Sequence, residues 1–242
     1  MKLYGINPVL ERLRVNPKSV KKIYIEQGQS GGIIQKKATQ NHVPFLLVPS
    51  TKMQKIGRDK NTQGFMADVE DFQYADYDDV LSNANEKHRT LIFLDELNDP
   101  QNLGVMLRSL ACLGRFAVIL TTHHSVSVTE AVLRIASGGD NYVLISRVAN
   151  LVNAIKKAKD QGYEIFAADV NEGEILGEKE FPANLGIVIG SEQKGIRDIV
   201  LNQVDGKITI PMYAENISFN AAQAMTIIAY EITRQKRQRQ KK

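Results

Sequence analysis

Two neighbouring stretches decide the fold: residues 186–200, with the sequence GIVIGSEQKGIRDIV, and residues 208–231, with the sequence ITIPMYAENISFNAAQAMTIIAYE. The first opens on a short apolar run typical of a buried strand, and residues 196–204 continue in a helical pattern. The second repeats this order, because an apolar run over 208–212 leads through a polar turn into a long helix. Polar side chains at the start of that helix are expected to face the strand ends.

A phosphate-binding loop is the first function to test against this pattern, and the residues exclude it. Gly190 and Gly195 have the spacing of such a loop. The next two residues are Ile196 and Arg197, where the mechanism requires a lysine and a hydroxyl side chain. The stretch is therefore not a nucleotide-binding P-loop.

The composition is that of a soluble globular protein, with 43% hydrophobic and 24% charged residues among 242. No apolar run approaches the ~20 residues of a membrane span and no secretory leader is recognisable, so we expect a cytoplasmic protein. The single cysteine, Cys112, is expected to be a small core residue on the apolar side of a helix over 100–114. The four histidines lack metal-ligand spacing, which disfavours a metal site.

Basic residues are concentrated at both ends of the chain. Residues 1–70 hold 12 Lys+Arg against 5 Asp+Glu, and residues 234–242 hold six basic residues and no acidic one. Because the net charge is only +4, the segment between them is acidic. Basic ends suit a polyanionic partner, since each neutralised phosphate releases counterions. The alternative is an ordinary solvated surface with a frayed tail.

Residues 1–70 alternate between helical and strand patterns and predict a small α/β domain. Asn7-Pro8 is a typical helix start, with asparagine as the cap and proline at the first helical position, and that helix is expected to reach Val15. Strands are expected near 22–26, 45–48 and 64–69, and helices near 33–41 and after a Ser50 cap. The polar, acidic residues 71–88, with a short helix over 77–84, are expected to link this domain to the rest of the chain.

Residues 89–242 repeat a strand–helix alternation, which predicts an open parallel sheet with helices on both faces and a ligand at the carboxyl ends of the strands. Strands are expected at 91–94, 117–120, 142–145 and 165–168, before the two opening stretches. Helices are expected from Pro100, from a Ser127 cap and from an Asn150 cap. No Gly-x-Gly-x-x-Gly follows the first strand, which disfavours an ordinary dinucleotide-binding fold.

Together with Asn-Leu-Gly-Val-Met-Leu-Arg over 102–108, the two stretches resemble the three motifs of the SpoU (TrmH) family of RNA ribose 2'-O-methyltransferases, in the SPOUT class. The resemblance covers roughly residues 89–231. The opening Tyr-Gly-Ile-Asn-Pro-Val over 4–9 and Thr-Gln-Gly over 62–64 look like the two-domain members of that family. One departure lies in the last motif, which reads Ser-Phe-Asn-Ala-Ala-Gln over 218–223 where the family usually has Ser-Leu-Asn-Val-Ser.

The resemblance implies a fold, a cofactor and partners. It implies a parallel-sheet SPOUT domain with a deep trefoil knot over 89–242, preceded by a substrate-binding domain similar to ribosomal protein L30e. It implies S-adenosylmethionine as cofactor, RNA as substrate, with ribosomal RNA favoured over tRNA, and a homodimer that uses the apolar face of the last helix. A relative that binds RNA without turnover is the alternative. The candidate RNA contacts are Lys21, Lys22, Lys36, Lys37, Lys52, Lys55, Arg58 and Lys60.

Methyl transfer to a hydroxyl requires an aligned nucleophile and a route for its proton, so the polar residues of the motifs are the candidates. By the resemblance, the reaction centre comprises Arg108, Asn102, Glu192, Ser218 and Asn220. The same resemblance implies that Gly190, Ile210 and Phe219 hold the cofactor. Asn102 also fits a simple helix-start turn, and Ser218 or Asn220 also fits a simple helix cap.

Arg108 lies in a mostly apolar part of the predicted helix, so we expect it to need a partner, and Glu192 is the natural one. The resemblance places this arginine at the reaction centre as the proposed base. A guanidinium with a pKa of about 12.5 to 13.8 is hard to deprotonate, which makes a phosphate clamp or a cation stabilising the alkoxide at least as plausible. A purely structural ion pair between the two residues is the third interpretation.

Overall fold

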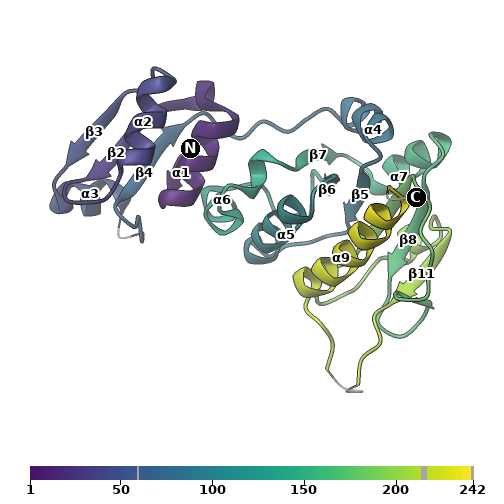
Figure 1. The fold of residues 1–242 in the computed structure, drawn as a ribbon. Coiled ribbons are helices and arrows are strands. Elements are labelled where there is room, and N and C mark those ends of the chain that lie inside the picture. Colours follow the sequence, from purple (N-terminus) through teal and green to yellow (C-terminus); the bar gives the residue numbers. More distant parts are fainter. Residues whose placement is uncertain (59, 214–216, 241–242) are drawn as a thin grey trace. The chain divides into compact units, whose positions relative to one another are not determined.

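The computed structural model describes residues 1–58, 60–213 and 217–240, and these form two compact units (Figure 1). The first unit comprises residues 1–73 and 128–142, and the second comprises residues 74–127 and 143–242. The chain therefore passes between the units at three places rather than through a single linker. The segment 128–142, which the sequence pattern assigns to the second domain, packs with the first unit.

The first unit is built on a four-stranded sheet in the order β1-β4-β2-β3. Its strands are β1 (Lys2–Tyr4), β2 (Val20–Glu26), β3 (Phe45–Val48) and β4 (Phe65–Val69). β4 pairs antiparallel with β1 and β2, whereas β2 and β3 are parallel. Its first three helices are α1 (Ile6–Val15), α2 (Gly32–Gln40) and α3 (Ser50–Gly57), and a short 3-10 helix, η1 (Pro17–Ser19), follows α1. The edge strand β1 is too short to have been recognised from the sequence.

Two helix starts in this unit differ from the sequence prediction by one or two residues. α1 begins at Ile6 after Gly5, whose positive φ of 97° turns the chain sharply out of β1, so Asn7 and Pro8 lie inside the first turn and Asn7 is not the cap. α3 begins at Ser50, with Pro49 as the residue before it. In both cases the preceding residue already makes the turn, so a side-chain cap is not required.

The segment 128–142 completes the first unit through buried polar contacts. It forms α6 (Glu130–Ala136), which is capped by Thr129 rather than by the predicted Ser127, and a short 3-10 helix, η2 (Gly139–Asn141). Asp140 accepts from Arg12 at 2.5 Å in an ion pair whose two side chains are almost completely buried. Glu130 accepts from the backbone N–H of Lys2 at 2.8 Å. The segment is thereby fixed to α1 and β1.

The second unit is built on a seven-stranded sheet in the order β7-β6-β5-β10-β8-β11-β9, and every pair in it is parallel. The strands are β5 (Thr90–Leu94), β6 (Phe116–Thr121), β7 (Leu144–Val148), β8 (Glu164–Ala168), β9 (Glu174–Ile175), β10 (Leu185–Ile189) and β11 (Gly206–Thr209). The predicted parallel α/β fold is confirmed. The threading of a trefoil knot stays a prediction.

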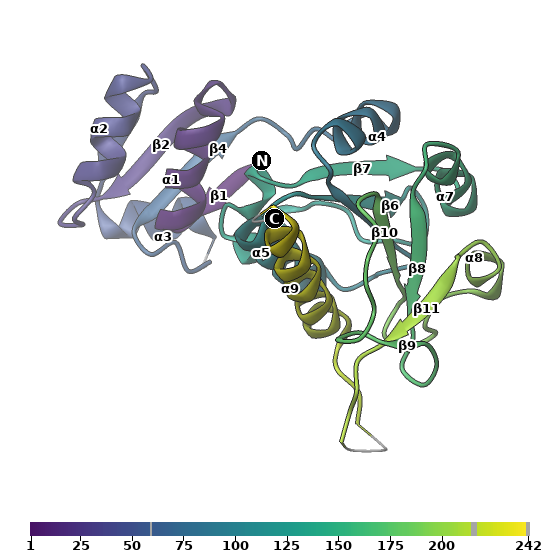
Figure 2. The same ribbon diagram turned by 45° about the vertical axis from the view of Figure 1, so that its right-hand side comes forward.

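Helices cover both faces of this sheet (Figure 2). They are α4 (Tyr77–Glu86), α5 (Pro100–Leu113), α7 (Leu151–Asp160), α8 (Asp198–Leu201) and α9 (Ala221–Arg239). Residues of α4, α7 and α8 share one buried cluster with alternate strand residues such as Phe93 and Ile119. α5 and α9 pack against each other, joined by a 2.9 Å hydrogen bond between the hydroxyls of Thr226 and Ser109.

Two segments are more ordered than their composition suggests. α4 lies within the predicted linker, yet its Val80, Leu81 and Ala84 are buried in the core of the second unit. The basic tail is not frayed as far as it is described, because α9 continues to Arg239; residues 241 and 242 lie outside the described residues. Among the described residues, none of the helices is long and apolar enough to span a membrane.

Candidate active site

Three of the predicted site residues meet in one hydrogen-bonded cluster. The amide nitrogen of Asn102 donates to the carboxylate of Glu192, and the amide oxygen of Asn102 accepts from the amide nitrogen of Asn220 at 2.7 Å. Asn102 is buried, while Glu192 and Asn220 are exposed. The cluster is therefore a buried amide that orients a carboxylate at the surface. Asn102 is not a simple turn residue, because Asp99 caps α5 instead.

Asn220 combines a structural role with its place in this cluster. Its side-chain oxygen accepts from the backbone N–H groups of Ala222 at 2.9 Å and Gln223 at 3.1 Å, while its nitrogen reaches Asn102. Gln223 in turn accepts from the backbone N–H of Asn220 at 3.2 Å, which completes a capping box. The departure from the family motif over 221–223 therefore supplies a group that fixes Asn220.

The loop after β10 carries Glu192 and is held from both sides. A Cβ atom on Gly190 would lie 2.2 Å from the carbonyl carbon of Gly195, so the loop can close on itself only with glycine at position 190. Ser191 and Gly195 exchange backbone hydrogen bonds of 3.1 and 2.9 Å. Glycine is thus required at position 190 by the close approach of the loop's own backbone.

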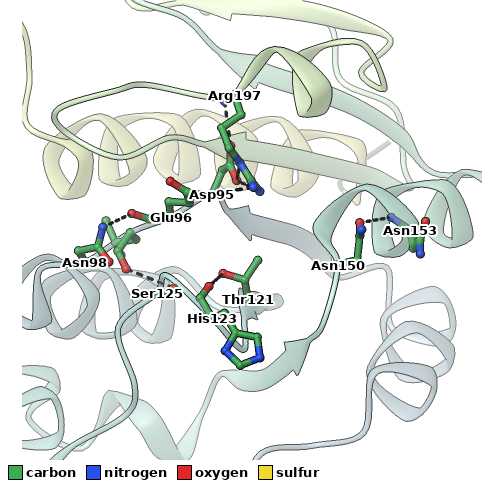
Figure 3. Close-up of polar contacts among 10 residues, drawn as sticks. Asp95, Glu96, Asn98, Thr121, His123, Ser125, Asn150, Asn153 and Arg197 are labelled. Atoms are coloured by element: carbon green, nitrogen blue, oxygen red, sulfur yellow. Dashed lines mark hydrogen bonds and ion pairs between the residues drawn. The ribbon is translucent and has the colours of Figure 1, made fainter.

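An ion pair with Asp95, the residue after β5, anchors the end of this loop (Figure 3). The guanidinium of Arg197 donates to Asp95 from Nε at 2.9 Å and from Nη2 at 2.6 Å. The backbone N–H of Arg197 also donates to the Asp95 carboxylate, at 2.9 Å. Asp95 is 0% exposed, and Glu96 lies 3.3 Å from the same guanidinium. These carboxylates raise the pKa of Arg197, chiefly through the hydrogen bond to Asp95.

The carboxyl ends of β5 and β6 carry further polar contacts beside this anchor (Figure 3). The hydroxyl of Thr121 donates to the carbonyl of His123 at 2.7 Å, and the amide of Asn98 donates to the carbonyl of Glu96 at 2.8 Å. The hydroxyl of Ser125 donates to the carbonyl of Leu97 at 3.2 Å. Local bonds of this kind fix the backbone of both loops next to the site.

An apolar pocket lies at the ends of the neighbouring strands β8 and β11. Ile210, Ser218 and Phe219 line it, together with the apolar side chains of Met212 and Ile228. Gly190 does not line this pocket, although β10 is the next strand of the sheet. Two of the three predicted cofactor residues therefore share one pocket, and the third lies at an adjacent strand end.

Asp169 is the acidic residue that lines this pocket, and the sequence interpretation missed it. Burial alone would raise the pKa of Asp169, but hydrogen bonds from the backbone of Asn171 and Glu172 and the ammonium of Lys207 hold it below its ordinary value. The carboxylate is thus ionised and fixed at the rim. Its position directly after β8 in a parallel sheet was a signal that could have found it.

Arg108 and Cys112 lie on the exposed face of α5, which corrects two expectations. The expected partnership fails because the described residues contain no ion pair between Arg108 and Glu192, whose carboxylate is bonded by Asn102. The physical reason is helical spacing: Val105, Arg108 and Cys112 share one face, and the core takes the opposite face. Arg108 therefore does not carry the cost of a buried charge.

The comparisons with known proteins identify the family of this chain. The model of the SpoU rRNA Methylase family matches residues 89–230, and the model described as RNA 2'-O ribose methyltransferase substrate binding matches residues 2–75. The chain belongs to the SpoU/TrmH family of RNA methyltransferases. A Staphylococcus epidermidis protein assigned to the TrmH family of tRNA/rRNA methyltransferases is 33% identical over 245 residues, covering 99% of this chain and 98% of that protein.

Solved structures show the same two-part SpoU fold. The SpoU methyltransferase AviRb from Streptomyces viridochromogenes, in complex with its cofactor AdoMet, superposes with a TM-score of 0.80 at 20% identity, covering 98% of this chain and 91% of that one. A protein of Porphyromonas gingivalis assigned to the TrmH family gives a TM-score of 0.75 at 22% identity, covering 95% and 88%. These similarities support the fold.

The candidate RNA contacts of the SpoU substrate-binding segment lie in the first unit. Lys52, Lys55 and Arg58 are exposed along α3 and just beyond it, and Lys21 and Lys36 are exposed on β2 and α2. Lys22 and Lys37 are half-buried, and Lys22 lies 5.7 Å from the centre of the Tyr24 ring. Lys60 is bound within the unit, because it lies 3.2 Å from Glu130 and 4.7 Å from the Tyr4 ring centre.

Proposed function

We propose that this protein transfers a methyl group from S-adenosylmethionine to a ribose 2'-hydroxyl of RNA, most favourably ribosomal RNA. The observation that carries the proposal is the cluster of Asn102, Glu192 and Asn220 at the carboxyl ends of the parallel strands. All three lie within residues 89–230, which the SpoU family model matches, and in the stretches whose sequence resembles the motifs of that family. Membership of the family supplies the RNA methyltransferase class, and the ribose hydroxyl and the ribosomal substrate are our proposal.

The pocket beside the cluster fits the cofactor chemically. Its lining is mostly apolar, as in sites that hold an aromatic base, and Asp169 adds a carboxylate at the rim. S-adenosylmethionine would supply an electrophilic methyl on a positively charged sulfur, and a fixed carboxylate suits that charge. Ile210 and Phe219 would contact the cofactor, and the turn at Gly190 would leave room at the adjacent strand end.

The cluster would position the ribose and its proton. Asn102 holds the carboxylate of Glu192 in one orientation, and Asn220 is itself held by the first turn of α9. An oriented carboxylate can accept a hydrogen bond from the attacking hydroxyl, which aligns it and lowers the barrier to losing its proton. Ser218, at the rim of the pocket, would donate or accept a further hydrogen bond. Arg108 would meet the substrate phosphate or the developing alkoxide as an exposed cation.

Calorimetry and a methyl-transfer assay test the proposal. S-adenosylmethionine should bind with a dissociation constant of micromolar order, near −8 kcal/mol. Labelled methyl should enter ribosomal RNA from cells that lack the protein, and mass mapping should locate it on a ribose. Labelling of tRNA alone would move the substrate assignment to tRNA.

An RNA-binding relative without turnover is the second candidate. It was suggested by the motif departure over 221–223, yet Gln223 completes the cap that holds Asn220 in the cluster. The altered motif thus preserves the geometry of the site, which favours an active enzyme. No heat of binding at millimolar cofactor, together with retained RNA binding, would favour the inactive relative.

We also propose a homodimer, although part of the apolar face of α9 that suggests it packs within the chain itself. Met225, Ile228 and Ile232 of α9 are buried in the second unit itself, whereas Ala221 and Ala224 are only half-buried. Val105 of α5 and Tyr230 of α9 remain 41% and 61% exposed. Sedimentation should give about twice the 27.0 kDa mass of the chain, and a monomer at micromolar concentration would contradict the proposal.

A further inference from the structure

A group of basic residues lies at the amino-terminal ends of the strands of the large sheet. The candidate active site lies at the opposite, carboxyl ends. Arg89 and Arg115 immediately precede Thr90 and Phe116, which are paired in register at the start of β5 and β6. Lys236, near the end of α9, reaches the same place, because its ammonium donates to the carbonyl of His88 at 2.7 Å and to the hydroxyl of Thr90 at 2.8 Å. We call Arg89, Arg115, Lys236 and Arg239 the edge cluster.

The edge cluster is held by neutral groups. Arg89 donates to the amide oxygen of Asn83 at 3.0 Å and to the carbonyl of Phe116 at 3.3 Å, and Arg239 donates to the carbonyl of Phe181. Within the described part of the chain, none of the four cations forms an ion pair with a carboxylate. Glu178 and Glu180 line a surface cavity with Arg239, but they do not pair with it.

The four positive charges act on one another. Burial, together with the smaller effect of the charges of Arg115 and Arg239, lowers the pKa of Lys236 to about 8. Burial also lowers the pKa of Arg89, and the charge of Arg115 adds to that effect. Like charges brought this close without a counter-charge are unfavourable unless an anion neutralises them. Arg115 and Arg239 are exposed, so an anion can reach them.

We propose that the edge cluster binds phosphate groups of the RNA backbone, as a second contact surface away from the reacting ribose. This proposal rests on the proposed function only in taking RNA as the partner. Arginine forks bind phosphate in bidentate fashion, and Lys236 adds a point charge that lies close enough to Arg115 and Arg239 to be affected by both. The contact is independent of sequence, and it would hold a segment of RNA remote from the methylated nucleotide.

Paired charge-removing variants test this proposal. Arg115→Gln/Arg239→Gln removes two exposed charges of the edge cluster, and Lys156→Gln/Lys157→Gln removes two exposed charges from α7 as the matched control. Binding of a labelled single-stranded RNA is measured by anisotropy over a range of salt concentrations. Loss of two phosphate contacts should reduce the slope of log K against log[salt] by about 1.4, which corresponds to roughly 25-fold weaker binding at ~0.1 M salt.

The α7 control should keep the wild-type slope, and both variants should remain folded at the assay temperature and keep their cofactor affinity. Equal slopes for wild type and the edge-cluster variant would overturn the proposal. So would equal losses in both variants, because a general charge effect would then explain them. Inorganic sulfate provides a second measurement: it should raise the thermal midpoint of wild type and of the α7 control more than that of the edge-cluster variant. If wild type transfers no methyl group but the edge-cluster variant still shows the reduced slope, the result counts only against the proposed enzyme.

Discussion

Asn102 and Arg108 lie on the same helix, yet their surroundings differ completely. Asn102 is 6% exposed and both ends of its amide are bonded, whereas Arg108 projects from the opposite, exposed side of α5. A structural ion pair between Arg108 and Glu192 is no longer an explanation for this arginine. Its remaining roles are a phosphate clamp, a cation for the developing alkoxide, or the base.

Substitution of Arg108 separates these roles. Arg108→Ala should nearly abolish the single-turnover rate while the thermal midpoint stays unchanged, because the side chain is exposed. Arg108→Lys should keep a fraction of the rate if the residue supplies a cation, since a point charge survives. If the residue is the base, lysine should shift the pH–rate profile to lower pH. A near-normal rate for the alanine variant would remove Arg108 from the catalytic residues.

Lys236 predicts a pH dependence of stability. Its pKa of about 8 in the folded protein lies below the ordinary 10.5. Between these two values the unfolded state binds more protons, so the free energy of unfolding should rise with pH there, by at most about 3 kcal/mol from this group. Lys236→Met should lack that rise when urea unfolding is compared across the same window. Parallel curves for the two proteins would show that this lysine titrates normally.

At the scale of elements, the loop from Gly190 to Arg197 connects the fold to the chemistry. Its beginning is closed by the turn between Ser191 and Gly195, and its end is fixed on β5 through Asp95. Glu192 lies within the Ser191–Gly195 turn, and Asn102 orients its carboxylate. Arg197 was first noticed because it excludes a P-loop, and its role in the structure is to position this loop.

Arg197→Ala should leave the buried carboxylate of Asp95 without its counter-charge. Breaking a fully buried pair from one side costs about 3–5 kcal/mol, and because the Arg197 side chain is 40% exposed while Asp95 is buried, urea unfolding should show a loss toward the lower end of that range. The matched control is Lys157→Ala, which breaks an exposed pair with Asp78 and should cost less than about 1 kcal/mol. In the folded Arg197→Ala fraction we also expect a slower methyl transfer, because Glu192 loses its support. Equal losses in both variants would contradict the anchoring role.

At the scale of the whole molecule, local sequence patterns predicted most helices and strands. They missed contacts between residues that are far apart in the sequence. Asn150 caps α7 and Pro100 opens α5 as expected, because a cap depends on only a few neighbouring residues. The site trio was found through motif residues. The Asp95–Arg197 pair joins residues about a hundred positions apart, and no periodicity reports such a pair. For the same reason the sequence does not show that 128–142 packs with residues 1–73.

That last difference alters what a truncation should do. A separate substrate domain over 1–70 would be removable without harm to the rest of the chain. In the structure, residues 1–73 pack with α6 and η2, where Val132 and Leu133 are buried and Asp140 has Arg12 as its counter-charge. Removing residues 1–73 would expose these apolar side chains and leave a carboxylate unpaired.

We therefore expect residues 74–242 alone to unfold at a lower temperature than the full chain and to aggregate. The loss should be reduced when Val132→Ser and Leu133→Ser make the exposed face of α6 polar, because the damage arises from that face rather than from the sheet. Calorimetric titration with S-adenosylmethionine should still detect binding in the soluble fraction, since Ile210, Phe219 and Asp169 all belong to the second unit. A truncated protein that unfolds at the full-length midpoint would show that segment 128–142 does not depend on residues 1–73. The N-terminal domain could then be treated as an independent module.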